Sequence, residues 1–145
     1  MAEINNNSSS ILGVEKKALK LLQECKTIYK SYKKQYMVHF RFIESSIKSI
    51  ELNGENLTVS NKTIFAKIIN KAKLLSSLMK TIEVNFNNSY EEFNSLDRKS
   101  ISSNIVKKFD LIYDDMNDAK ENFNRDINKI IAYSDLIEHG KNFDI

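Results

Sequence analysis

Apolar residues recur at alternating steps of three and four along most of this chain, and that spacing constrains its fold more than any other feature. Between residues 11 and 52, two interleaved sets each repeat every seven residues: Leu22, Tyr29, Tyr36, Ile43 and Ile50, and Ala18, Cys25, Tyr32 and His39. This is the spacing of an α-helix that buries one stripe of side chains. The pattern predicts a helix over about 11–52.

Two later segments show the same spacing. In the second segment the predicted core residues are Phe65, Ile68, Ala72, Leu75, Met79, Ile82, Phe86, Phe93 and Leu96. In the third they are Ile105, Phe109, Ile112, Met116, Ala119, Phe123, Ile130, Tyr133 and Ile137. These stripes predict helices over about 60–96 and 102–138.

Residues that break helices are scarce and stand at the ends of the three segments. The chain has no proline and three glycines in 145 residues, too few turn residues for an all-β fold. Turns are expected at residues 53–56 (Asn-Gly-Glu-Asn) and 97–100 (Asp-Arg-Lys-Ser). Ser60, and either Ser102 or Ser103, suit helix N-caps, and Gly140 suits the position after the last helix.

The predicted fold is all-α: an antiparallel up-down-up bundle of three long helices with coiled-coil-like packing, over residues 11–138. The short connections favour antiparallel neighbours. The polar residues 1–10 are expected to be a disordered N-terminal tail, and residues 139–145 a C-terminal tail. Asp126 and Asn85 fall at or near core positions, where isolated polar residues often fix the register of packed helices.

The stretch YKSYKKQYMVHFRF, residues 29–42, combines five aromatic residues with four basic ones and one histidine. At about 100° per residue, Tyr32, Tyr36 and Phe40 lie within roughly 60° of Tyr29, and the basic residues lie on one flank. The aromatic side chains are therefore predicted to face the core, with tyrosine hydroxyls reaching its rim. Nucleic-acid stacking requires aromatic rings exposed within the basic surface, so this arrangement argues against it.

No motif for catalysis, metal binding or cofactor binding is present, and the chain is predicted not to be an enzyme. His39 is expected to be partly buried with a hydrogen-bond partner on the next helix. Cys25 lies on the apolar stripe and is expected to be an unreactive buried thiol. Neither histidine has a glutamate three residues before it, and there is no glycine-rich phosphate-binding loop. Catalytic, cofactor-binding and metal-binding residues are therefore expected to be absent.

Three sets of residues are candidates for binding a partner. A third apolar track on the first helix exceeds what one neighbour needs, a basic ribbon flanks the aromatic residues, and an acidic line runs along the third helix. The apolar track is Val14, Leu21, Ile28 and Phe42. The basic ribbon is Lys26, Lys30, Lys33, Lys34, Arg41 and Lys48. The acidic line is Asp110, Asp114, Asp118 and Glu121.

These sets predict a non-enzymatic helical interaction module that binds another helical protein or itself through an apolar stripe and charged faces. A cytoplasmic location is expected, because the start of the chain lacks the pattern of a Sec signal peptide and no apolar run reaches membrane-spanning length. One alternative is a small helical protein exported by, or partnering with, a bacterial secretion system, without a cleavable signal peptide. Another is weak nucleic-acid binding through the basic ribbon, which the net charge of +3 permits.

Overall fold

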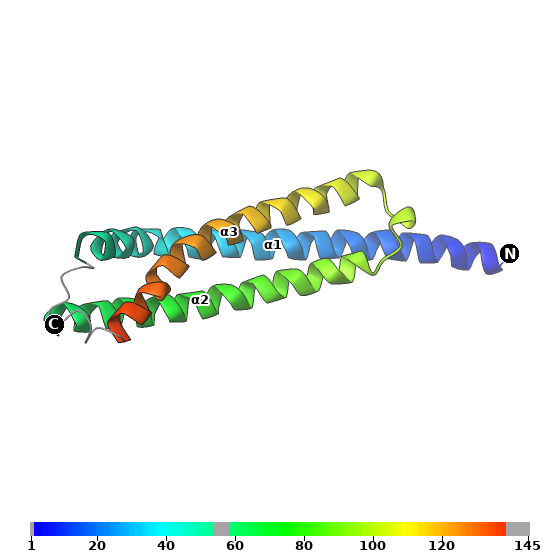
Figure 1. The fold of residues 1–145 in the computed structure, drawn as a ribbon. Coiled ribbons are helices and arrows are strands. Elements are labelled where there is room, and N and C mark those ends of the chain that lie inside the picture. The colour runs from blue at the N-terminus through cyan, green and yellow to red at the C-terminus, as the bar shows by residue number, and fades with distance from the viewer. Residues whose placement is uncertain (1, 54–58, 139–145) are drawn as a thin grey trace. The chain divides into compact units, whose positions relative to one another are not determined.

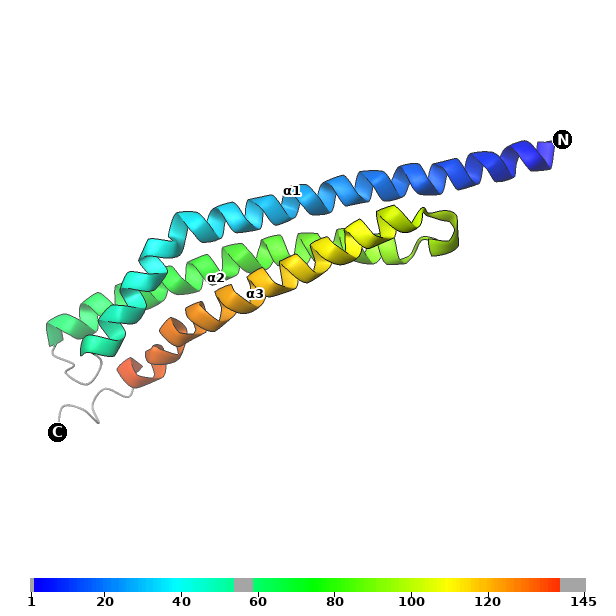
Figure 2. The ribbon, with the colours of Figure 1, turned by 90° about the horizontal axis from the view of Figure 1, so that it is seen from above.

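A computed structural model of the chain describes residues 2–53 and 59–138, and over these ranges it contains helices and no strand. The elements are α1 (Ala2–Asn53), α2 (Val59–Asn94), the short 3₁₀ helix η1 (Arg98–Ser100) and α3 (Ser103–Glu138) (Figure 1). The three long helices pack against one another, which confirms the predicted all-α three-helix bundle (Figure 2).

The chain divides into two compact units, and each long helix contributes to both. Among the described residues, the first unit comprises 2–33 and 82–119, and the second comprises 34–53, 59–81 and 120–138. That residues 11–138 form one domain stays a prediction.

The core of the first unit is built mainly from the predicted stripes and is rich in aromatic residues. Its buried apolar side chains are Ala18, Leu21, Leu22, Cys25, Tyr32, Phe86, Phe93, Ile101, Ile105, Phe109 and Met116. The rings of Phe93 and Phe109 stack with centroids 3.5 Å apart, and those of Tyr90 and Tyr113 stack at 4.3 Å. These two contacts join α2 to α3 directly beside the turn that connects them.

Side-chain pairs in the first unit establish the directions of its helices. Along α1, Lys17 contacts Glu92, Glu24 contacts Ser89, and Tyr32 contacts Glu83 on α2. Residue numbers rise on one helix as they fall on the other, so α1 and α2 run antiparallel here. The stacked pairs between α2 and α3 follow the same rule.

The second unit has its own core, again with one stripe from each helix. Its buried apolar side chains are Ile43, Phe65, Ile69, Ala72, Leu75, Met79, Phe123, Ile127, Ile130 and Tyr133. The rings of Phe65 and Tyr133 meet edge to face at 5.4 Å, which ties α2 to α3. Ile69 is buried where the spacing predicted Ile68, which is half-buried.

The connection between α2 and α3 is held by local polar contacts, as predicted for residues 97–100. The carboxylate of Asp97 accepts hydrogen bonds from the Lys99 amide (3.1 Å) and the Ser100 hydroxyl (3.2 Å). Ser102 then caps α3, because its Oγ accepts a hydrogen bond from the Ile105 amide at 3.4 Å. Gly54, Glu55 and Asn56 of the other predicted turn, and Gly140, lie outside the described residues.

Two boundaries and one polar position differ from the prediction. α1 begins at Ala2, so residues 2–10 are placed in a helix where the pattern predicted a disordered tail. Asparagine and serine cost only tenths of a kcal/mol per residue in a helix, and an existing helix extends without a new nucleation step. Helix α2 includes Ser60 rather than being capped by it. Asn85 is exposed, so it cannot fix register in the core.

Replacing Phe109 by alanine is expected to lower the free energy of unfolding by about 3–5 kcal/mol, because it removes a fully buried ring stacked on Phe93. Urea denaturation followed by circular dichroism measures the change. Leu19→Ala, at a half-exposed position of the same unit, serves as the control and should change stability by less than about 0.5 kcal/mol. Equal losses in the two variants would show that this core is not the one described.

Candidate partner-binding surface

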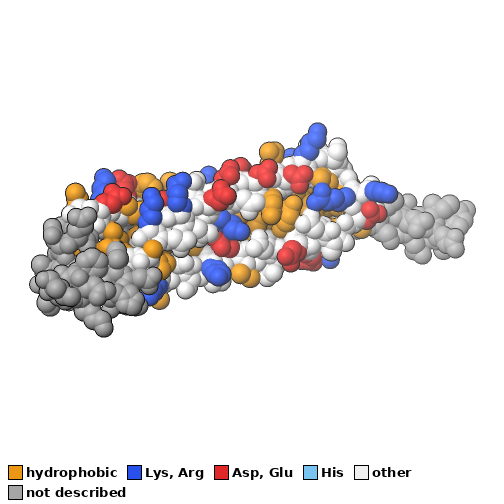
Figure 3. Space-filling model, viewed as in Figure 1, with side chains coloured by type: hydrophobic (Ala, Val, Ile, Leu, Met, Phe, Trp, Pro, Cys, Tyr) orange, Lys and Arg blue, Asp and Glu red, His pale blue; other side chains and the backbone are white. Residues whose placement is uncertain are grey.

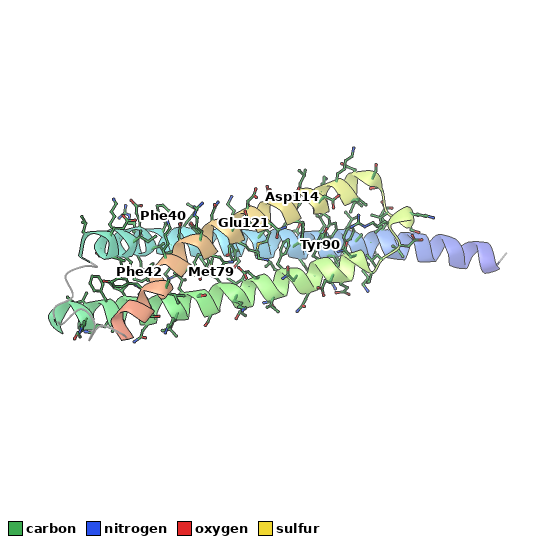
Figure 4. All side chains as sticks on the ribbon, in the orientation of Figure 1. Phe40, Phe42, Met79, Tyr90, Asp114 and Glu121 are labelled. Atoms are coloured by element: carbon green, nitrogen blue, oxygen red, sulfur yellow. The ribbon has the colours of Figure 1, made fainter. Side chains whose placement is uncertain are left out.

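The aromatic residues of the stretch 29–42 are mostly turned toward the core, as predicted. Tyr32 is fully buried, and Tyr29, Tyr36 and Phe42 are half-buried. Phe40 is 45% exposed, so its predicted core position was wrong (Figure 4). In packed helices of 3.5 residues per turn each residue advances by about 103°, which places Phe40 and Tyr32 about 50° to opposite sides of Tyr29. The core lies on the Tyr32 side.

The tyrosine hydroxyls reach acidic partners on neighbouring helices, each within one unit. Tyr32 donates to Oε1 of Glu83 at 3.2 Å, and Tyr36 donates to Oδ2 of Asp126 at 3.1 Å. Burial, and then the hydrogen bond and charge of Asp126, raise the pKa of Tyr36 above its ordinary value. The predicted tyrosine hydroxyls at the rim are confirmed, and the half-buried Asp126 links α3 to α1.

His39 is half-buried, but its described hydrogen bond differs from the prediction. Its Nδ1 lies 2.9 Å from the backbone oxygen of Gln35, four residues earlier on the same helix, and not from a group on the next helix. A side chain directed back along its own helix meets the carbonyl of the preceding turn. The imidazole therefore has a local structural partner in the residues described.

Cys25 has the environment of a structural thiol. Its side chain is fully buried, and burial, with the charge of Glu24 second, raises its pKa to about 11. A thiol with that pKa carries almost no thiolate at neutral pH. Over the described residues no group of three histidine, cysteine, aspartate or glutamate side chains could hold a metal ion.

A shallow depression of about 530 Å³ lies in the first unit beside the start of the described core. Its lining is mainly charged, with Lys16, Lys17 and Lys20 facing Glu24 and Glu92. Lys17 Nζ is paired with Glu92 Oε1 at 3.2 Å. Exposed lysines balanced by glutamates do not define a ligand, so this depression is not a candidate active site.

The apolar track predicted to bind a partner is largely covered within the chain. Leu21 is only 3% exposed, so its predicted place on a binding surface was wrong. Val14, Ile28 and Phe42 are half-buried. Lys71 of α2 lies over the Phe42 ring, with its Nζ 4.4 Å from the ring centroid. The apolar track of α1 is therefore mostly covered by the rest of the chain and leaves little surface for a partner.

The basic ribbon faces solvent, apart from the half-buried Lys26. Lys26, Lys30 and Lys33 belong to the first unit, and Lys34, Arg41 and Lys48 to the second. Lys33 lies over the Tyr29 ring at 5.3 Å, and Lys48 pairs with Glu44 at 3.3 Å on its own helix. Both contacts are local, so the ribbon retains cations available to a partner.

The acidic line of α3 also faces solvent as predicted. Asp110, Asp114 and Asp118 are exposed in the first unit and Glu121 in the second. Figure 4 labels Asp114 and Glu121 on α3. In the described part of the chain none of the four carboxylates makes an ion pair.

The structure adds an apolar surface that the spacing did not single out. Met37, Val38 and Phe40 are 72%, 65% and 45% exposed on α1 in the second unit, and we call them the α1 patch. Lys34 and Arg41 lie three residues before and four residues after Met37, on the same side of the helix. In the space-filling view, hydrophobic side chains likewise reach the surface between charged ones (Figure 3). Met37 and Val38 fall outside both heptad core positions, and this position in the sequence could have predicted their exposure.

Comparisons with known proteins give no information about the function of this chain. No family model matches the chain, and neither a curated protein nor a solved structure matches it. None of the helices in the described ranges combines the length and hydropathy needed to cross a membrane.

The raised pKa of Cys25 predicts a specific loss of stability at alkaline pH. Below about pH 9 the thiol is protonated in both states, and its full contribution is present. Between pH 9 and 11 the unfolded chain loses this proton while the folded chain keeps it, so folding is disfavoured as pH rises. From pH 8 to 10 the wild type should lose about 1 kcal/mol more than Cys25→Ala.

Urea denaturation at both pH values measures this difference. Tyrosines and lysines titrate in both proteins, so their effect on stability drops out when the wild type is compared with the alanine variant. Equal losses in the two proteins would contradict a buried, protonated thiol at position 25.

Proposed function

We propose that this chain is a non-enzymatic interaction module that binds another helical protein through the α1 patch. The observation that carries the proposal is the exposure of three large apolar side chains within four residues of a helix whose opposite side is buried. Exposed apolar surface rimmed by polar residues is typical of protein interaction sites. Methionine, phenylalanine and arginine are also enriched at such interfaces.

The residues around the patch indicate the chemistry of the partner. Met37 and Phe40 are one turn apart, so they present an apolar ridge that fits the groove of an amphipathic helix. Lys34 and Arg41 lie beside that ridge without an ion pair among the described residues. A partner helix with an apolar stripe edged by carboxylates complements both features.

The burial of the aromatic residues favours a protein partner over a nucleic acid. Stacking platforms for single strands need several exposed rings along the basic surface. Of the five aromatic residues in 29–42, Phe40 alone is exposed and Tyr32 is fully buried. The high pKa and burial of Cys25 likewise support a role without nucleophilic chemistry.

A comparative pull-down from the organism that encodes the chain tests the proposal. The bait proteins are wild type, Met37→Ser/Val38→Ser, and Val84→Ser as a control at an exposed apolar position outside the patch. We expect at least one protein to be retained by wild type and control and lost with the patch variant. Circular dichroism checks that all three baits are equally helical.

The binding constant of the recovered partner then gives the quantitative result. Loss of the patch should weaken binding at least tenfold, about 1.4 kcal/mol, because buried apolar anchors dominate interface energies. The same retained proteins and the same affinity for all three baits would contradict the proposal.

A further inference from the structure

The charges of α2 and α3 are segregated along the sequence. Residues 59–81 of α2 contain five lysines, at 62, 67, 71, 73 and 80, and no acidic residue. Residues 110–119 of α3 contain four aspartates, at 110, 114, 115 and 118, and no basic residue. The first block lies in the second unit and the second block in the first unit.

The basic block exposes an apolar stripe among its cations. Ile64, Lys67, Lys71, Leu74 and Leu78 follow steps of three and four, which places them on one side of α2, and all five are exposed. We call them the basic stripe. Leu74 is 74% exposed and Leu78 45%. This side of α2 therefore combines apolar side chains with Lys67 and Lys71, which make no ion pair in the described chain, although Lys71 also lies over the Phe42 ring.

The acidic block exposes the complementary combination. Leu111 is 63% exposed, and Asp114 and Asp118 follow it at steps of three and four on the same side of α3. We call Leu111, Asp114 and Asp118 the acidic face. Neither aspartate has an ion-pair partner among the described residues.

The spacing of the two surfaces allows one antiparallel register that pairs Leu74 and both lysines of the basic stripe with the acidic face. On α2, Lys71 and Lys67 lie three and seven residues before Leu74, and on α3, Asp114 and Asp118 lie three and seven residues after Leu111. When Leu74 faces Leu111 on an antiparallel helix, Lys71 faces Asp114 and Lys67 faces Asp118. An apolar contact followed along the helices by two opposite-charge pairs is typical of specific helix pairing.

We propose that the basic stripe of one copy of this chain binds the acidic face of a second copy. The contact uses neither Met37, Val38 nor Phe40 of the α1 patch, and its occupant is a second copy of the chain instead of another protein. The occupant is inferred from complementarity within the sequence itself, since each copy carries both halves of the contact. The two charge pairs make the association sensitive to salt.

Sedimentation velocity of the full chain at about 1–200 μM and low ionic strength tests the proposal through charge reversal. Wild type should associate, and K67E/K71E and D114K/D118K should each weaken association at least about tenfold, because like charges then face each other. K73E/K80E makes the same change of charge at exposed positions outside the stripe and should associate as wild type does.

Mixing the two charge-reversed variants, K67E/K71E and D114K/D118K, is the most direct test of the contact. In the mixture each normal surface finds a normal complement and each reversed surface a reversed complement, so association should return. Circular dichroism of each variant establishes that it is folded. A monomeric wild type up to 200 μM, unchanged association of the reversed variants, or no recovery on mixing would each overturn the proposal.

Two further measurements separate this proposal from the function proposed above. Met37→Ser/Val38→Ser should leave self-association unchanged, because the α1 patch is not part of the contact. If wild type is monomeric and instead binds anionic vesicles or an acidic protein through the basic stripe, the second copy is the wrong occupant while the α1 patch remains untested by that result.

Discussion

The structure depends on the burial of one apolar stripe from each of three helices. Each fully buried large side chain contributes about 1.5–3 kcal/mol relative to exposure, and no helix of this composition could hide its stripe alone. Aromatic residues supply much of the packing, as in the stack of Phe93 on Phe109 and the edge contact of Phe65 with Tyr133. Because the apolar stripes are buried, the residues that can bind a partner lie on the outer sides of the helices.

Polar residues at the edge of the core add specificity to this packing. The rings of Tyr32 and Tyr36 face the interior, and their hydroxyls donate hydrogen bonds to Glu83 and Asp126 on neighbouring helices. The raised pKa of Tyr36 extends the pH range over which its hydroxyl is a hydrogen-bond donor further into the alkaline region. Such contacts favour one register over slippage by a turn, since a slipped register leaves the hydroxyls without these acceptors.

The helices and most of the core could be predicted from sequence, because apolar spacing and the lack of proline point to the same structure. Finer positions could not. Ile69 is buried in place of Ile68, and Phe40 is exposed, because small differences in helical angle decide which of two adjacent apolar residues faces the core. The candidate site was harder still. Leu21 was assigned to the surface because the sequence does not show which neighbour covers a wide stripe. Met37 and Val38 lie outside the apolar stripes, and they were missed because single exposed apolar residues are common on helix surfaces and do not mark a binding site by themselves.

Nuclear Overhauser spectroscopy with selectively labelled phenylalanine and tyrosine tests the packed interior most directly. The account predicts cross-peaks between the ring protons of Phe93 and Phe109, whose centroids lie 3.5 Å apart, and between those of Phe65 and Tyr133. These two pairs report on the two units independently. Assigned rings without these cross-peaks, in a protein that is still helical, would show that the stripes do not meet as described and would contradict the account.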